Sequence, residues 1–234
     1  TSATSGNVIS DVATAYDTTT WSASQTPTIG EARWTGRASK YAADGTPTWQ
    51  TTTSTGYDGL GRVTTVTDAV GAKTTTVYTP AAAWPMTGTA VTNALGHLTT
   101  TTFDPAWGQA IRVVDAYRKI TSTRYDALGR LSGVWLANVN GNTSYTPNTS
   151  FSYHVSATAA SWVSMSRMGR DPSYPRIVSY TLYDALLRER QTQTPSPRGG
   201  RVITEKFYNS RGLVERVYTD VYDNTTTPNG TLVE

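Results

Sequence analysis

The sequence predicts an all-β fold built from tandem antiparallel β-hairpins, and three observations lead to this prediction. One six-residue motif, called the phrase below, occurs twice almost unchanged, as YDGLGR at residues 57–62 and YDALGR at residues 125–130. Turn signals of the form Asp-x-x-Gly recur at steps of about ten residues. The runs between them are short and rich in Thr, Val and Tyr, which favour strands, and no long run has helical apolar spacing. Internal repeats of this kind indicate an array in which each hairpin packs on its neighbours.

The repeated phrase has a physical reading as a turn. An Asp at its first position accepts a hydrogen bond from the backbone two residues on, and the later Gly adopts a positive φ without steric cost. This predicts a type I turn closed by a left-handed glycine, with the preceding Tyr and the following Arg facing each other where the strands leave the turn. The role of the motif is then structural. Its residues, looser copies included, are Tyr57, Asp58, Gly61, Arg62, Asp68, Gly71, Asp104, Tyr125, Asp126, Gly129, Arg130, Tyr183, Asp184, Arg188, Tyr208 and Gly212.

The regularity of the repeats divides the chain into four parts of one continuous array. Residues 1–56 are degenerate or capping repeats, and residues 57–135 are regular repeats with one irregular loop at 79–86, where prolines forbid a central strand. Residues 136–182 form an irregular insertion, with a short helix expected near residues 156–165. Residues 183–234 return to the repeat pattern.

Composition excludes several classes of function. The formal net charge is only +3 and charged residues make up 16% of the chain, without a dense basic run, so we expect no nucleic-acid partner. With no cysteine, disulfides and thiolate chemistry are absent. No apolar run is long enough for a membrane span, and no signal peptide is visible.

The sequence carries no pattern that indicates an enzyme or a cofactor. His97 stands at the arginine position of a decayed turn phrase, and His154 has no nearby Cys or second His, so zinc spacing is absent. Most Asp residues occupy turn positions that hairpin geometry explains. Calcium is the one ion that remains open, through a turn expected at residues 220–224.

Two carboxylate pairs leave a hydrolase as a minor alternative. Glu205 with Glu215, or Asp171 with Glu189, could form a glycosidase pair, although such pairs arise by chance among many carboxylates. We therefore expect no catalytic, cofactor-binding or metal-binding residue.

The two full copies of the phrase, the Asp-x-x-Gly partner turn and the period of about 21 residues resemble the YD repeats of bacterial Rhs proteins, which also occur in toxin-complex C components and teneurins. The resemblance extends over about residues 40–234, with a faint further match at Tyr16 and Asp17. It implies a curved, spiralling β-sheet strip that closes into a shell around a C-terminal toxin or effector of the same polypeptide. No counterpart of the family's self-cleaving segment is present. The sequence ends at residues 229–234 while still repeat-like, so we expect the chain to be an excerpt of a larger protein that is secreted or on the cell surface.

The aromatic residues leave a second function open. One Tyr or Phe per repeat is expected to pack within the strip, since side chains alternate between the faces of a strand. Tryptophans in or near loops could instead face a ligand such as a cell-surface glycan. These are Trp84, Trp107, Trp135 and Trp162. Unpaired strand edges at the ends of the strip predict edge-to-edge self-association.

Overall fold

The computed structural model describes residues 10–169 and 175–233, and within them the predicted all-β fold is confirmed. These residues form sixteen strands and one short 3₁₀ turn, η1 (Ala137–Val139), with no α-helix. The chain divides into two compact units, residues 1–119 and residues 120–234.

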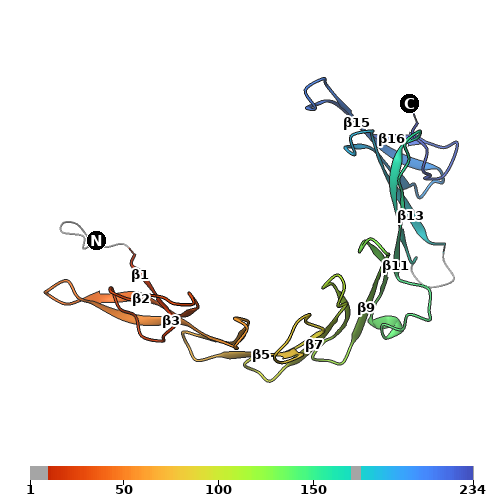
Figure 1. The fold of residues 1–234 in the computed structure, drawn as a ribbon. Helices are drawn as coiled ribbons and strands as arrows, with labels where there is room; N and C mark the ends of the chain where they lie inside the picture. Colours follow the sequence, from red (N-terminus) through yellow and green to blue (C-terminus); the bar gives the residue numbers. More distant parts are fainter. Residues whose placement is uncertain (1–9, 170–174, 234) are drawn as a thin grey trace. The chain divides into compact units, whose positions relative to one another are not determined.

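The first unit is an antiparallel meander in which each strand pairs with the next along the chain (Figure 1). The strands are β1 (Val12–Tyr16), β2 (Ala32–Tyr41), β3 (Pro47–Tyr57), β4 (Val63–Asp68), β5 (Lys73–Thr79), β6 (Gly88–Thr92), β7 (Leu98–Phe103) and β8 (Ala110–Val114). The predicted irregular loop lies between β5 and β6. Gln25, in the long connection after β1, accepts the Tyr16 N–H and donates to the Thr14 carbonyl, so it satisfies part of the free edge of β1.

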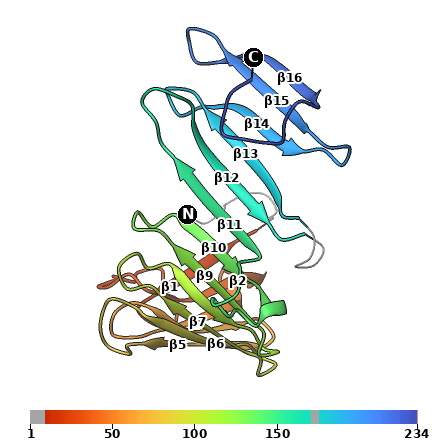
Figure 2. The same cartoon turned by 90° about the vertical axis from the view of Figure 1, so that its right-hand side faces the viewer.

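The second unit repeats the same plan, and its strands lie in sequence order in Figure 2. They are β9 (Ile120–Tyr125), β10 (Leu131–Trp135), β11 (Thr149–His154), β12 (Ser161–Arg167), β13 (Ile177–Tyr183), β14 (Glu189–Pro195), β15 (Arg201–Tyr208) and β16 (Val214–Asp223). Because a meander returns to the same edge at every second turn, the YD phrases gather on one edge of each unit. We call it the repeat edge. It holds the turns after β1, β3, β5 and β7, and those after β9, β11, β13 and β15.

The prediction of a short helix near residues 156–165 is wrong. β12 is extended and pairs on both sides, with Met165 opposite Phe151 of β11 and opposite Ser179 of β13. Hydrogen bonds to two neighbours outweigh the weak local preference of a Ser/Ala-rich run. Within residues 136–182, the irregular parts that the structure describes are therefore the η1 loop (136–148), the turn at 155–160 and the flanks of β12 and β13. The four-part division at 56, 135 and 182 stays a prediction.

Few described side chains are fully buried, since no described helix packs on either face of the strands. The apolar ones are Ala13, Ala15, Trp135, Leu182 and Ile203. In the second unit the final segment crosses β14: Gln191 donates to the Val233 carbonyl at 2.7 Å and Gln193 to the Thr231 carbonyl at 2.8 Å. Both glutamines are buried, so these bonds satisfy amides that would otherwise be costly.

Candidate functional site

The turn at residues 58–62 shows how the repeated phrase folds. Asp58 Oδ1 accepts the backbone N–H groups of Leu60 at 2.9 Å and Arg62 at 3.0 Å, and Gly61 has φ +73°. Asp58 Oδ2 also accepts the Arg62 Nε–H at 2.7 Å. One carboxylate therefore closes the backbone turn and holds the arginine side chain.

The turns at 126–130 and 184–188 repeat this arrangement. The Nε atoms of Arg130 and Arg188 each lie 2.7 Å from Oδ2 of Asp126 and Asp184. Gly129 has φ +74°, but Leu187, at the equivalent position of the later turn, adopts φ +58°. A leucine side chain is disfavoured in this left-handed region, so the later turn carries backbone strain that the earlier ones avoid.

The expected pairing of Tyr and Arg within one phrase is wrong. Tyr57 lies opposite Val63, after a register shift at Gly56. The Arg62 guanidinium instead covers the ring of Tyr78, the aromatic residue of the next repeat, 4.4 Å from its centroid. The register that places Thr65 opposite Thr75 brings these two residues together across β4 and β5.

The same contact recurs at the other two complete phrases. Arg130 lies 4.3 Å from the Tyr153 ring, and Arg188 lies 4.3 Å from the Tyr208 ring. Each tyrosine hydroxyl donates to the carbonyl of the residue after the arginine, at 2.7–2.9 Å: Tyr78 to Val63, Tyr153 to Leu131 and Tyr208 to Glu189. We call each set of one Asp, one Arg and the next repeat's Tyr an arginine clamp. The ion pair holds the arginine within its own turn, and the cation–π contact and the tyrosine hydrogen bond join that hairpin to the next one.

The electrostatics of the clamps keep them charged near neutral pH. Donation from the Arg130 backbone N–H, assisted by the guanidinium, lowers the pKa of Asp126. Partial burial acts to raise the pKa of Asp58 and Asp184, but hydrogen bonds from Arg62 and Arg188 outweigh it, so both pKa values are lowered. Burial raises the pKa of Tyr153, which keeps its hydroxyl protonated as a donor.

A partial clamp precedes the complete ones. Asp17 accepts four backbone N–H groups from residues 28–31, and the Ile29 N–H is the main cause that lowers its pKa. The Tyr57 hydroxyl donates to the Ala32 carbonyl at 3.1 Å, as in a clamp. No arginine completes the pair with Asp17, because Glu31 closes this turn and binds Arg33 instead.

The remaining motif residues lie in or beside turns. Asp68 Oδ1 accepts two backbone N–H groups, and Gly71 has φ +85°, at the edge opposite the repeat edge. Asp104 accepts the N–H groups of Ala106 and Trp107. Gly212 has φ +80° in the turn after β15, and Tyr125 ends β9 opposite Leu131.

The four tryptophans occupy different environments. Trp84 is 63% exposed and Trp107 is 53% exposed. Trp135 is only 4% exposed and donates from Nε1 to the Tyr145 carbonyl at 2.6 Å, so the η1 loop covers it and it packs within the unit. Trp162 is half-buried, stacked on His154 with ring centroids 5.2 Å apart.

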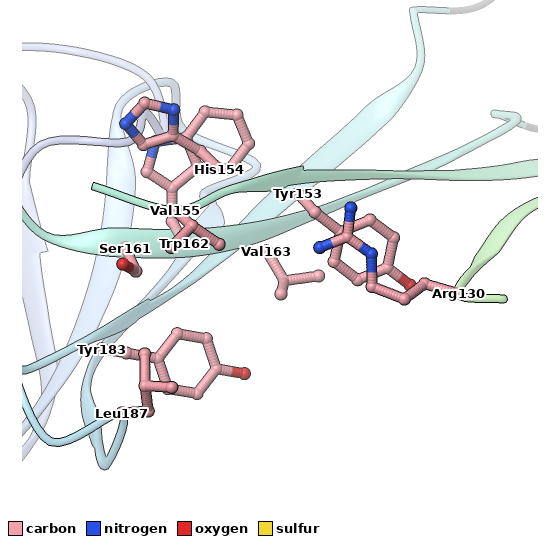
Figure 3. Close-up of a pocket in the computed structure, with 9 residues that line it drawn as sticks. All are labelled: Arg130, Tyr153, His154, Val155, Ser161, Trp162, Val163, Tyr183 and Leu187. Carbon is pink, nitrogen blue, oxygen red and sulfur yellow. The ribbon is translucent and has the colours of Figure 1, made fainter. Parts of the chain in front are cut away.

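A pocket of about 270 Å³ lies at the repeat edge of the second unit (Figure 3). Its lining includes Arg130, Tyr153, Val163, Tyr183 and Leu187, with apolar surface predominating. In Figure 3, Val163 and Tyr183 lie on one side of the strands and His154 and Trp162 on the other. Sequence reasoning missed this pocket, although the register that pairs Arg with the next Tyr could have located it.

Two of the four carboxylates considered for catalysis form ion pairs, and a third, Glu215, is exposed on β16. Glu205 pairs with Arg190 and Glu189 with Lys206, both at 2.7 Å, while Asp171 lies outside the described residues. His97 is an exposed turn residue, as expected.

The turn expected to offer calcium ligands at residues 220–224 is largely strand. Asp220 and Asp223 belong to β16, and Asp223 binds Arg201 at 2.7 Å. In the part of the chain that the structure describes, no three His, Cys, Asp or Glu residues gather to hold a metal ion. No helix among the described residues is long and apolar enough to cross a membrane.

Comparison with known proteins gives no match to a family model or to a curated protein. Among solved structures, the chain is similar to a crystal structure of TcdB2-TccC3-TEV, with a TM-score of 0.67 and 11% identity, over 94% of this chain and 17% of that one. It is also similar to TcdB2-TccC3, with a TM-score of 0.63 and 12% identity, over 89% of this chain and 15% of that one.

A third similar structure is a Tc holotoxin pore of Photorhabdus luminescens, with a TM-score of 0.53 and 16% identity, over 80% of this chain and 10% of that one. The chain thus spans less than a fifth of each of these chains. At these identities the likeness concerns the fold: the antiparallel meander has counterparts in structures of toxin complexes.

Proposed function

We propose that this chain is a non-enzymatic structural segment of a secreted Rhs/YD-repeat protein. In this role it forms wall of a curved β-shell that encloses a C-terminal toxin or effector of the same polypeptide. The observation that carries the proposal is the arginine clamp, which occurs three times at the repeat edge and at each place ties one hairpin to the following one. The similarity to TcdB2-TccC3 structures supports the same role.

The interactions of the clamp residues are consistent with a structural role in the wall of a shell. Each clamp carboxylate is held by its own arginine at 2.7 Å, so it is not available as a catalytic base. Among the described residues of each unit, a strand pairs only with its sequence neighbours, so more repeats lengthen the sheet without changing the contacts already made. A shell of any circumference could be built by such extension.

The test uses the full-length natural protein that contains these residues. Its product is run on a denaturing gel and then by gel filtration under native conditions. The proposal expects a C-terminal fragment that is cleaved from the repeat region, co-elutes with it and resists added protease until the repeat region is unfolded. A product that stays intact, with a protease-accessible C-terminal region, would contradict it.

Exposed tryptophans favour a second candidate, an extracellular adhesion module that binds carbohydrate. Trp84 and Trp107 are each more than half exposed, so their rings could stack on sugars. A glycan array probed with the chain, its Trp84→Ala variant and its Trp107→Ala variant tests this. Binding that either substitution abolishes would favour adhesion, and an array without signal would count against it.

Self-association of the isolated chain is part of the proposal. β16 leaves one strand edge of the second unit unpaired among the described residues, and its Val217, Tyr218 and Val221 are each more than 40% exposed. We expect concentration-dependent dimers in sedimentation velocity experiments. A single monomeric species over a wide concentration range would contradict this part.

A further inference from the structure

The clamp of the first unit is covered by its own chain. Arg62 Nη1 donates to the Pro80 carbonyl at 3.3 Å, and Nη2 donates to the Ala81 carbonyl. The ring of Trp84 lies 5.6 Å from the same guanidinium. The loop after β5 therefore occupies the outer side of Arg62, and only 6% of this arginine side chain is exposed.

The corresponding clamp of the second unit is open. Arg130 has the same ion pair to Asp126 and the same stacking on Tyr153, at nearly identical distances. Among the described residues, its Nη1 and Nη2 atoms have no hydrogen-bond partner, and 37% of the side chain is exposed. The guanidinium thus offers unused N–H donors beside the pocket.

Two features near the turn after β11 explain why the Arg130 clamp is not covered. Residues 155–160 fold on themselves, because Ser156 Oγ accepts the N–H groups of Thr158 and Ala159, and the turn contributes no carbonyl to Arg130. Ser161 stands opposite Tyr183, at the register position that an arginine holds in the complete clamps. Within the described residues, Tyr183 therefore has no cation over its ring and its hydroxyl has no hydrogen bond.

We propose that this pocket binds an extended peptide segment that carries an aromatic side chain. The carbonyl oxygens of the peptide accept hydrogen bonds from the Arg130 Nη groups, and its aromatic side chain enters the space between Tyr153, Val163, Tyr183 and Leu187. The loop at 80–84 provides the internal precedent, since it meets Arg62 with two carbonyls and one tryptophan. The proposal holds whether or not the chain belongs to a shell.

The size and charge of the pocket favour this occupant. Its volume of about 270 Å³ lies just below the range of about 300–1,000 Å³ that is usual for small-molecule sites, so it suits one inserted side chain. Asp126 already neutralises Arg130, so a neutral carbonyl suits the remaining donors better than a second carboxylate. The apolar lining favours an aromatic side chain over a sugar.

The probe is the loop itself, supplied in trans as an end-blocked, fluorescently labelled peptide of residues 79–86, Thr-Pro-Ala-Ala-Ala-Trp-Pro-Met. Fluorescence anisotropy follows its titration with the 234-residue chain. We expect saturable binding, weakened about tenfold by Arg130→Lys, since lysine lacks the planar fork of donors. Val163→Phe, which fills the pocket, should abolish binding, and a peptide with Ala in place of Trp should bind at least about fivefold more weakly.

Arg62→Lys is the matched control, because its own loop covers that clamp. It should leave peptide binding unchanged, and circular dichroism with thermal melting should show that all three variants are folded. No saturable binding up to about 1 mM would overturn the proposal, as would binding that Val163→Phe leaves unchanged. Equal weakening by Arg62→Lys would also overturn it, because the peptide would then be displacing the loop of the first unit.

Discussion

The clamps at Arg62 and Arg130 share one motif and nearly one geometry, yet their exposures differ sixfold. In both, the arginine lies 2.7 Å from its aspartate and 4.3–4.4 Å from the next tyrosine ring. The exposed fraction of the side chain is 6% at Arg62 and 37% at Arg130. This difference in exposure shows that the motif determines how neighbouring hairpins contact each other. The next loop on the repeat edge determines whether the clamp arginine is covered.

The largest effect is expected where a covered arginine is removed. Arg62→Ala removes the donor to Asp58 Oδ2 and to two carbonyls in a closed environment, which should cost about 3 kcal/mol of unfolding free energy. Arg130→Ala, at an exposed pair, should cost about 1 kcal/mol. Urea denaturation of both variants checks this. Equal losses would show that the loop at 80–84 does not set the difference.

A smaller loss is expected when a turn glycine is replaced. Gly129 has φ +74°, a conformation that a β-branched residue resists. Gly129→Val should therefore destabilise the second unit by about 1–2 kcal/mol. Thermal melting measures the change, and an unaltered melting temperature would mean that the turn at 126–130 is not formed as described.

Introducing a glycine in place of Leu187 should stabilise the turn at residues 184–188. Leu187 adopts φ +58° where the other clamps have glycine, and it is 65% exposed, so its side chain contributes little packing. Leu187→Gly should raise the unfolding free energy by up to about 1 kcal/mol, because relief of strain exceeds the added chain entropy. A lower melting temperature would show that contacts of Leu187 outweigh the strain.

Change of pH within the neutral range should have the smallest effect. The pKa values of Asp58, Asp126 and Asp184 are lowered in the folded chain, so their contribution to stability is complete above the ordinary Asp pKa. This stabilising contribution is lost as the pH falls through the lowered pKa values of the folded state. Protonation of Asp223, whose pKa is about 2, removes a further contribution. Melting temperatures should be level from about pH 5 to 7 and fall below about pH 4. A rise in stability on acidification would contradict these assignments.

Local chemistry was predictable from the sequence, but contacts between repeats were not. The Asp-x-x-Gly phrases predict the turns because the interactions that form them span five residues, as at Asp58 and Gly61. The partner of Arg62 lies sixteen residues away and that of Arg130 twenty-three, since loop length varies. The pairing follows only from strand register, which a single sequence leaves unspecified where loops are irregular.

Contacts distant in the sequence also explain the environment of Trp135 and the strand at residues 161–167. Trp135 lies beside an irregular loop, so its sequence context leaves a ligand-facing position open, yet that loop folds over it. Residues 161–167 lack a strong strand signal and become a strand through pairing on both sides. In both cases a tertiary partner overrides what the local residues favour.

The most direct test of whether the clamp joins successive repeats is a double-mutant cycle on Arg62 and Tyr78. Arg62→Ala, Tyr78→Leu and the double variant are unfolded in urea, and the coupling free energy is taken from the four stabilities. If the clamp joins successive repeats, the coupling should be about 1 kcal/mol, as expected for a guanidinium held over a ring in a largely closed site. Additive losses, with a coupling near zero, would show that the two residues act separately and that the clamp does not join the hairpins.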